Sequence, residues 1–235
     1  MMSYLKDLSK SMTPEKKVNA KKDIFAFYVG RPLSYVLTVP FLWLNIRPNI
    51  VSIIAAIEII IAGIVLSMAN NIKVAVFGWF LFFLWNLLDG VDGNIARLKK
   101  NGSKIGSVYD AMSGYEAMFL LYFCAGIFSF NMSNYSDYSQ IIIGAISGMS
   151  VIFPRLVMHK ANTELGVEKG SNLTNKQSFG LGKTIALNIT SISGLVQVLL
   201  LLAILSNTVM YFSYCYLVIN VAIMLVSIRN VLRGE

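Results

Sequence analysis

Three aspartates, Asp89, Asp92 and Asp110, lie at the ends of long hydrophobic segments of the chain. A charged carboxylate within a bilayer costs about 3 kcal/mol, so aspartates at such positions usually belong to a functional site. Mg²⁺, Mn²⁺ and Ca²⁺ prefer oxygen ligands, and two or three neighbouring carboxylates can hold such an ion. The sequence therefore predicts a divalent-metal site formed by these three residues.

Small residues and an arginine accompany the first two aspartates. If this segment is helical, Asp89, Asp92 and Ala96 share one face, and Gly93 adjoins them. Gly93 and Ala96 would then leave a shallow notch beside the carboxylates. Arg97 follows at once, and a guanidinium there could neutralise phosphate oxygens. The pattern favours a site for a phosphorylated ligand.

The third aspartate follows a short basic connection, residues 99–104, that separates two hydrophobic segments. Asp110 comes one helical turn after Gly106. If the two segments form a helical hairpin, Asp110 comes back to face Asp89 and Asp92. The hairpin is the element that must position the predicted site.

The composition indicates an integral membrane protein. Of 235 residues, 56% are hydrophobic and 14% are charged, and the mean hydropathy is +0.64. A helix needs about 20 apolar residues to cross a bilayer. By this criterion we predict an all-α fold with six transmembrane helices: Pro48–Ala69, Ile72–Leu98, Ile105–Phe130, Tyr138–His159, Thr184–Ser206 and Val209–Ile228.

The positive charges are placed asymmetrically around these spans. Lysines and arginines precede the first span, fill the second and fourth connections and follow the last span, whereas the first, third and fifth connections contain almost none. Basic loops remain cytoplasmic, so both termini and the aspartate end of the hairpin should face the cytoplasm. The net charge of +8 is then a topology signal that also attracts lipid headgroups, and we expect no nucleic-acid binding. A prokaryotic plasma membrane is the expected location.

The chain divides into two parts. Residues 1–47 should form a cytoplasmic and interfacial segment, and residues 48–235 the six-helix domain. Within the first part, residues 24–46 are apolar but contain Pro32 and Pro40, which suits a helix lying in the membrane interface.

The aspartate segment resembles the signature of the CDP-alcohol phosphotransferases, membrane enzymes with six transmembrane helices. The resemblance implies that the aspartates bind a pair of divalent ions, Mg²⁺ or Mn²⁺, and that the small residues and the arginine contact the nucleotide of a CDP-linked donor. It also implies that an alcohol attacks the β-phosphorus, that CMP leaves, and that the protein is a homodimer. The pattern Asp-x2-Asp-Gly-x2-Ala-Arg-x8-Gly-x3-Asp is matched by Asp89, Asp92, Gly93, Ala96, Arg97, Gly106 and Asp110.

The chain departs from this signature at Gly114. The family has a fourth aspartate there, to which the resemblance assigns metal binding and removal of the acceptor proton. Three alternatives stay open. Water could complete the metal site while the reaction uses another base or an acidic acceptor, the chain could be inactive, or Glu116 could be the base. Because Glu116 projects about 200° around the helix from position 114, it is the weakest of the three.

Three later residues are candidates for the acceptor side. Arg155, near the end of the fourth predicted span, could bind an acceptor phosphate or lipid headgroup, or could simply extend to the interface. Lys183 partly matches a later lysine-rich element of the family and is a second candidate for such a phosphate. His159 is the only histidine in the chain, and we expect an interface residue rather than a proton shuttle.

Three functions remain to be distinguished. The first is metal-dependent transfer of a phospho-alcohol or phosphatidyl group from a CDP-linked donor to a lipid or small alcohol, with release of CMP. The second is a catalytically silent relative that binds a CDP-linked lipid or a partner. The third is an ion-coupled transporter, which the clustering of acids at one face and the adjacent basic loop disfavour.

Overall fold

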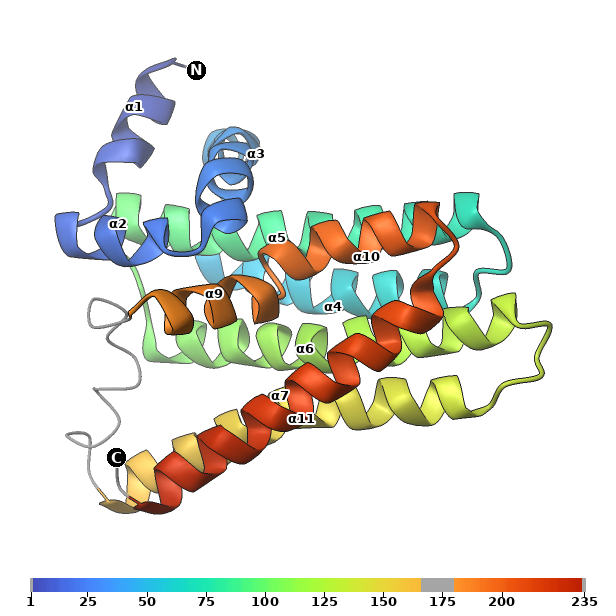
Figure 1. The fold of residues 1–235 in the computed structure, drawn as a ribbon. Helices are drawn as coiled ribbons and strands as arrows, with labels where there is room; N and C mark the ends of the chain where they lie inside the picture. Colours follow the sequence, from blue (N-terminus) through green and yellow to red (C-terminus); the bar gives the residue numbers. More distant parts are fainter. Residues whose placement is uncertain (1, 166–179, 234–235) are drawn as a thin grey trace.

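The structure is a computed structural model that describes residues 2–165 and 180–233. Within these ranges the chain is helical, without strands, as the composition predicts. Figure 1 shows the course of the chain. Its elements are α1 (Met2–Lys10), α2 (Pro14–Lys21), a π-helical turn η1 (Ala26–Gly30), α3 (Arg31–Trp43), α4 (Pro48–Ser67), α5 (Ile72–Lys99), α6 (Lys104–Met132), α7 (Ser139–Leu165), α9 (Leu181–Thr190), α10 (Leu195–Leu205) and α11 (Val209–Arg233).

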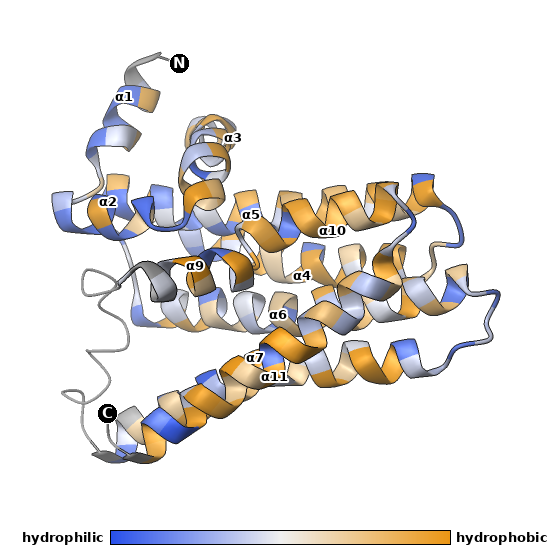
Figure 2. Cartoon of the chain, in the orientation of Figure 1, coloured by the Kyte–Doolittle hydropathy of each residue, from blue (hydrophilic) through white to orange (hydrophobic). Residues whose placement is uncertain are grey.

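Five helices, α4, α5, α6, α7 and α11, are long and apolar enough to cross a membrane. Figure 2 shows hydrophobic residues along most of their length and hydrophilic residues at the ends and in α1 and α2. The fifth predicted span, Thr184–Ser206, differs from expectation, because it is broken rather than continuous. Its two parts, Thr184–Thr190 and Leu195–Leu205, meet at 48° and make the sixth span only together.

The spans pack as a bundle around α4, α5 and α6. α4 packs against both α5 and α6, α7 packs against α6 and α11, and α10 lies along α5 (Figure 1). The core contains the fully buried side chains of Phe82, Trp85, Tyr122 and Phe128. These aromatic residues bring α5 and α6 into one continuous hydrophobic cluster with α4 and α10.

Glycines allow α6 and α7 to approach closely. A Cβ atom added to Gly126 would lie 2.4 Å from the Gln140 carbonyl oxygen, and one added to Gly144 would lie 2.6 Å from the Tyr122 carbonyl oxygen. Both distances are shorter than van der Waals contact. This interface therefore depends on two residues without side chains, Gly126 in the second half of α6 and Gly144 in α7.

The interfacial segment folds as η1 and α3 and packs across α5. At this crossing a Cβ on Gly90 would meet the Ser34 side chain at 2.9 Å. Figure 1 shows α1, α2 and α3 gathered at the end of the bundle where α5 ends and α6 begins, and both described chain ends lie toward that end. The two termini thus share one end of the bundle, as an even number of crossings requires.

The predicted hairpin is formed by α5 and α6. Lys100 adopts a left-handed backbone conformation (φ 51°) that ends α5, and its amide donates to the Ala96 carbonyl. Ser103 then caps α6 by accepting a hydrogen bond from the Gly106 amide at 3.0 Å. The two caps turn the chain within four residues and place Asp110 in the second turn of α6.

Candidate active site

All seven signature residues line one cavity of about 490 Å³ at the hairpin end of the bundle. α5 supplies Asp89, Asp92, Gly93, Ala96 and Arg97, whereas α6 supplies Gly106 and Asp110. The remaining walls come from η1, α3, the first residues of α4 and the break between α9 and α10. The N-terminal segment is therefore part of the cavity wall.

The three aspartates lie close together on the cavity wall. The Asp89 and Asp110 side chains are in hydrogen-bonding contact, and Asp92 is near enough to interact with both electrostatically. Two carboxylates in contact require a shared proton or a cation, because their charges repel. Asp92 is buried and accepts a hydrogen bond from the Ser52 hydroxyl of α4.

The aspartates have the right chemistry for a hard cation but do not form a complete ligand set as they stand. In residues 2–165 and 180–233, no three Asp, Glu, His or Cys side chains converge as metal ligands. Asp92 is turned toward Ser52, while Asp89 and Asp110 contact each other. Oxygen donors on one cavity wall nevertheless fit Mg²⁺ or Mn²⁺, so the predicted metal site stays a prediction.

A polar network holds Arg97 against the cavity. Its Nη2 donates to Asn94 Oδ1 at 2.7 Å, and the Asn94 amide donates to Thr38 Oγ1 at 3.0 Å and to Ser34 Oγ at 3.3 Å. Asn94 is fully buried, so its geometry is determined by α3. The guanidinium is thereby oriented by two helices while several of its N–H groups stay available to a ligand.

Two signature glycines make room for polar groups. A Cβ on Gly93 would lie 3.0 Å from Arg97 Nη1, and one on Gly106 would lie 2.7 Å from Asn49 Oδ1. Each glycine therefore allows a side chain to lie flat against the helix backbone. The prediction of a notch beside the carboxylates describes this geometry, and the structure adds that Arg97 covers part of it.

Sequence reasoning did not place Arg31, Ser52 or Ser193 in a site, although all three line the same cavity. Arg31 begins α3, its Nε has no hydrogen-bond partner, and its charge interacts with that of Arg97. Two guanidinium groups at one cavity indicate an anionic ligand. No local spacing relates Arg31, at the start of α3, to the signature on α5 and α6.

A second cavity, of about 430 Å³, lies on the other side of Asp89 and Asp110. These two aspartates and Ser193 line both cavities. Other residues that line the second cavity include Gly114, Arg155 and His159, together with residues of α9 and of the break after it. The structure thus brings Arg155 to the same space as the position at which the fourth aspartate is missing.

One predicted residue, Glu116, does not join these cavities. Glu116 is absent from the described walls of both, and its Oε2 is buried without a hydrogen-bond partner. Its role as a base remains an untested prediction that the cavity geometry does not favour. Lys183 falls in α9, but its side chain lies outside the described part of the structure.

Fold and site together define a class of protein. It is a polytopic helical membrane protein that has a cavity lined by carboxylates and arginines at one end of its bundle. The family model of CDP-alcohol phosphatidyltransferase matches residues 45–228. The chain therefore belongs to this family, whose members are transferases that act on CDP-alcohols and generally depend on divalent metal ions. Neither the comparison with curated proteins nor that with solved structures finds a match.

Proposed function

We propose that the protein transfers a phospho-alcohol or phosphatidyl group from a CDP-linked donor to the hydroxyl of a lipid or small alcohol, with release of CMP. The observation that supports this most directly is the convergence of all seven signature residues on one cavity. The order of these residues along the chain would not by itself bring them to one cavity, since they come from two helices joined by a turn.

The first cavity is the proposed donor site. Arg97 and Arg31 would bind the diphosphate, because their guanidinium groups face the cavity and carry the opposite charge. Gly93 and Ala96 would let the nucleotide approach the backbone of α5. Ser52 would hold Asp92 in one orientation, which limits the rearrangement needed when the donor binds.

The proposed metal ligands are Asp89, Asp92 and Asp110, with two Mg²⁺ or Mn²⁺ ions. Bound there, divalent ions would neutralise the diphosphate and the charge that develops on the departing CMP. The protein's part is then to place the donor β-phosphate at the wall that the two cavities share. Asp89 and Asp110 lie on that wall.

The second cavity is the proposed acceptor site. Arg155 lines it and could bind an acceptor phosphate or headgroup, and a cavity of about 430 Å³ suits a small polar molecule. A hydroxyl in this space would approach the β-phosphate from the side opposite the nucleotide. Cytoplasmic orientation of this end, a prokaryotic plasma membrane and homodimerisation belong to the same proposal.

The test is CMP release from purified protein in lipid nanodiscs. CDP-diacylglycerol and soluble CDP-alcohols would be offered with Mg²⁺ or Mn²⁺ and a panel of acceptors that includes phosphorylated and unphosphorylated alcohols. We expect acceptor-dependent and metal-dependent CMP release with at least one pair. Asp137→Asn, which changes a carboxylate in the α6–α7 connection, should leave the rate unchanged and serves as the control.

Gly114 supports one alternative, a silent relative that binds the donor without turning it over. That alternative predicts metal-dependent binding of cytidine diphosphate compounds and no CMP release with any acceptor. Equilibrium binding measured on the same nanodiscs therefore separates the two functions. Protein that neither binds these nucleotides nor releases CMP would contradict both.

A further inference from the structure

The absence of a side chain at position 114 leaves a space in the second cavity. A Cβ added to Gly114 would have no heavy atom within 4 Å apart from its immediate surroundings in α6. Gly126 and Gly144, in contrast, are required by close backbone contacts. Glycine within a helix costs about 0.5–1 kcal/mol relative to alanine, and at position 114 no packing contact offsets this cost. Its observable effect is an enlarged cavity.

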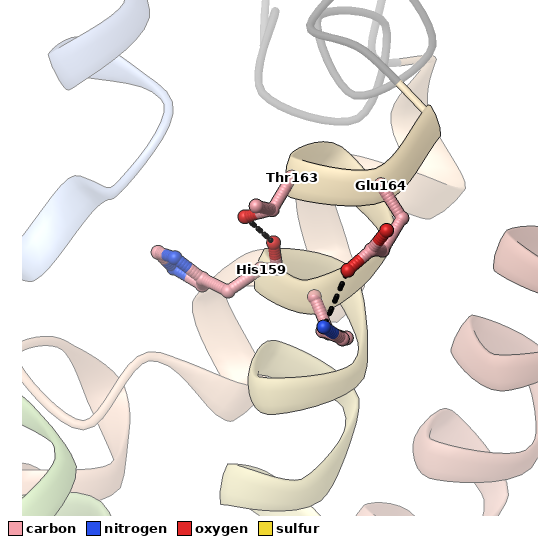
Figure 3. A network of polar contacts seen from close by, with 4 residues as sticks. His159, Thr163 and Glu164 are labelled. Atoms are coloured by element: carbon pink, nitrogen blue, oxygen red, sulfur yellow. Dashed lines mark hydrogen bonds and ion pairs between the residues drawn. The ribbon is translucent and has the colours of Figure 1, made fainter.

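His159 lies on the wall of the same cavity. It follows Arg155 by four residues, so both side chains are on one face of α7, and both line the cavity. Figure 3 shows the imidazole projecting from α7 in a different direction from Glu164, which pairs with Lys160. The His159 ring therefore faces the cavity and does not take part in the ion pair at the end of the helix.

A ring contact connects His159 to the neighbourhood of Gly114. The imidazole meets the Tyr115 ring edge to face, with centroids 6.1 Å apart and planes at 88°. Tyr115 is the residue that follows Gly114, and it also lines the cavity. Tyr115 thus holds the only imidazole of the chain at the cavity that Gly114 also lines.

We propose that His159 accepts the proton of the acceptor hydroxyl in place of the missing aspartate, an inference that rests on the proposed function. The acceptor oxygen forms a bond to the donor β-phosphorus, and the bond from that phosphorus to the oxygen bridging to the α-phosphate breaks. CMP leaves with that bonding pair. The hydroxyl proton passes to the free imidazole nitrogen, directly or through one water, and then to solvent at the exposed helix end.

The charged surroundings agree with this role. Arg155 lies on the same helix face and would attract an anionic acceptor to the imidazole, while Asp89 and Asp110 lie across the same cavity on α5 and α6. Asp23 also lines the cavity, but its carboxylate accepts hydrogen bonds from Ser191 and from the Ala26 amide. Among the described carboxylates of this cavity, Asp23 is therefore a structural residue, because its oxygens already accept hydrogen bonds within the protein.

The test compares His159→Gln with Lys160→Gln in the nanodisc assay. His159→Gln should lower kcat by about 100-fold or more, the usual contribution of a general base. Its affinity for the CDP-linked donor should not change, because the donor cavity is not altered. Lys160→Gln removes a neighbouring exposed charge and should keep the wild-type rate and its pH profile.

A second variant makes the test specific for proton transfer. Restoring the carboxylate with Gly114→Asp in the His159→Gln background should recover CMP release and extend activity to lower pH, because a carboxylate remains deprotonated where an imidazole is protonated. If wild-type protein releases CMP and His159→Gln retains its rate and pH profile, the inference is wrong and the proposed function stands. If wild-type protein releases no CMP with any acceptor, the proposed function and this inference both fail.

Discussion

The two cavities share Asp89 and Asp110 but differ in how closely they follow the family signature. The first contains every residue that the signature assigns to the nucleotide, and hydrogen bonds from Ser52 of α4 to Asp92 and from Asn94 to Thr38 of α3 connect its wall to the neighbouring helices. The second lacks the signature aspartate and has an open space at Gly114. If the proposed function holds, donor binding and acceptor activation depend on partly different residues, so that one can change while the other is kept.

The largest expected effect comes from the shared wall. Asp89→Asn should reduce CMP release by at least about 100-fold, which corresponds to about 2.7 kcal/mol of transition-state stabilisation. The same variant should weaken metal-dependent nucleotide binding, because the residue lines both cavities. Full activity of Asp89→Asn would show that the two cavities do not meet at a reaction centre.

A substitution remote from both cavities should separate stability from activity. Gly144→Val places a branched side chain where even a Cβ would lie 2.6 Å from the Tyr122 carbonyl oxygen. Overpacking of this kind costs about 1–3 kcal/mol, which should appear as a lower midpoint in denaturant titration. The donor KM of the folded fraction should remain that of wild type, and a changed KM would connect the α6–α7 contact to the donor cavity.

Arg97 and Arg155 should each affect the binding of a different substrate. Arg97→Gln is expected to raise the donor KM by about tenfold and to leave the acceptor KM unchanged, since a charged hydrogen bond contributes about 1.5 kcal/mol. Arg155→Gln should do the reverse. Steady-state kinetics with each substrate varied in turn measures both constants, and an equal rise of both in either variant would contradict two separate sites.

The smallest effect is expected far from the cavities, at the start of α7. Asp137 accepts hydrogen bonds from the Ser139 hydroxyl and the Gln140 amide, which hold the pKa of its carboxyl below the ordinary value of 3.8. A depressed pKa stabilises the fold above that ordinary value, and the effect disappears as pH falls through the lower, folded-state pKa. Protection of the first α7 amides against hydrogen exchange, relative to the intrinsic rate at each pH, should therefore fall below pH 4, less so in Asp137→Asn, while the cavities are unaffected.

The sequence predicts the parts of this fold that local patterns determine. The five continuous spans and the hairpin follow from apolar length and from turn residues such as Lys100 and Ser103. The bend at 191–194 was missed, because hydropathy averages over the whole segment and does not detect a break whose polar groups are satisfied by distant residues.

The part of the site that could be predicted from the sequence is the part whose residues follow the regular intervals of the signature. The seven signature positions were found from their intervals, and all of them line the first cavity. Arg31, Ser52 and Ser193 could not be found in this way, because tertiary packing alone brings α3, α4 and the α9–α10 break to α5. His159 was expected to be an interface residue, and no spacing in the sequence indicated that it would line a cavity together with Gly114.

The break between α9 and α10 has a consequence for how the protein assembles. α10 has 11 residues and α9 has 10, so neither is long enough to cross a bilayer alone. The carbonyls of Ile189, Ser193 and Gln197 are bound by side chains of Tyr216, Asn86 and Trp79 respectively. Two of these donors are on α5 and one is on α11, which is synthesised after α10. This span should therefore reach its final shape only after α11 has entered the membrane.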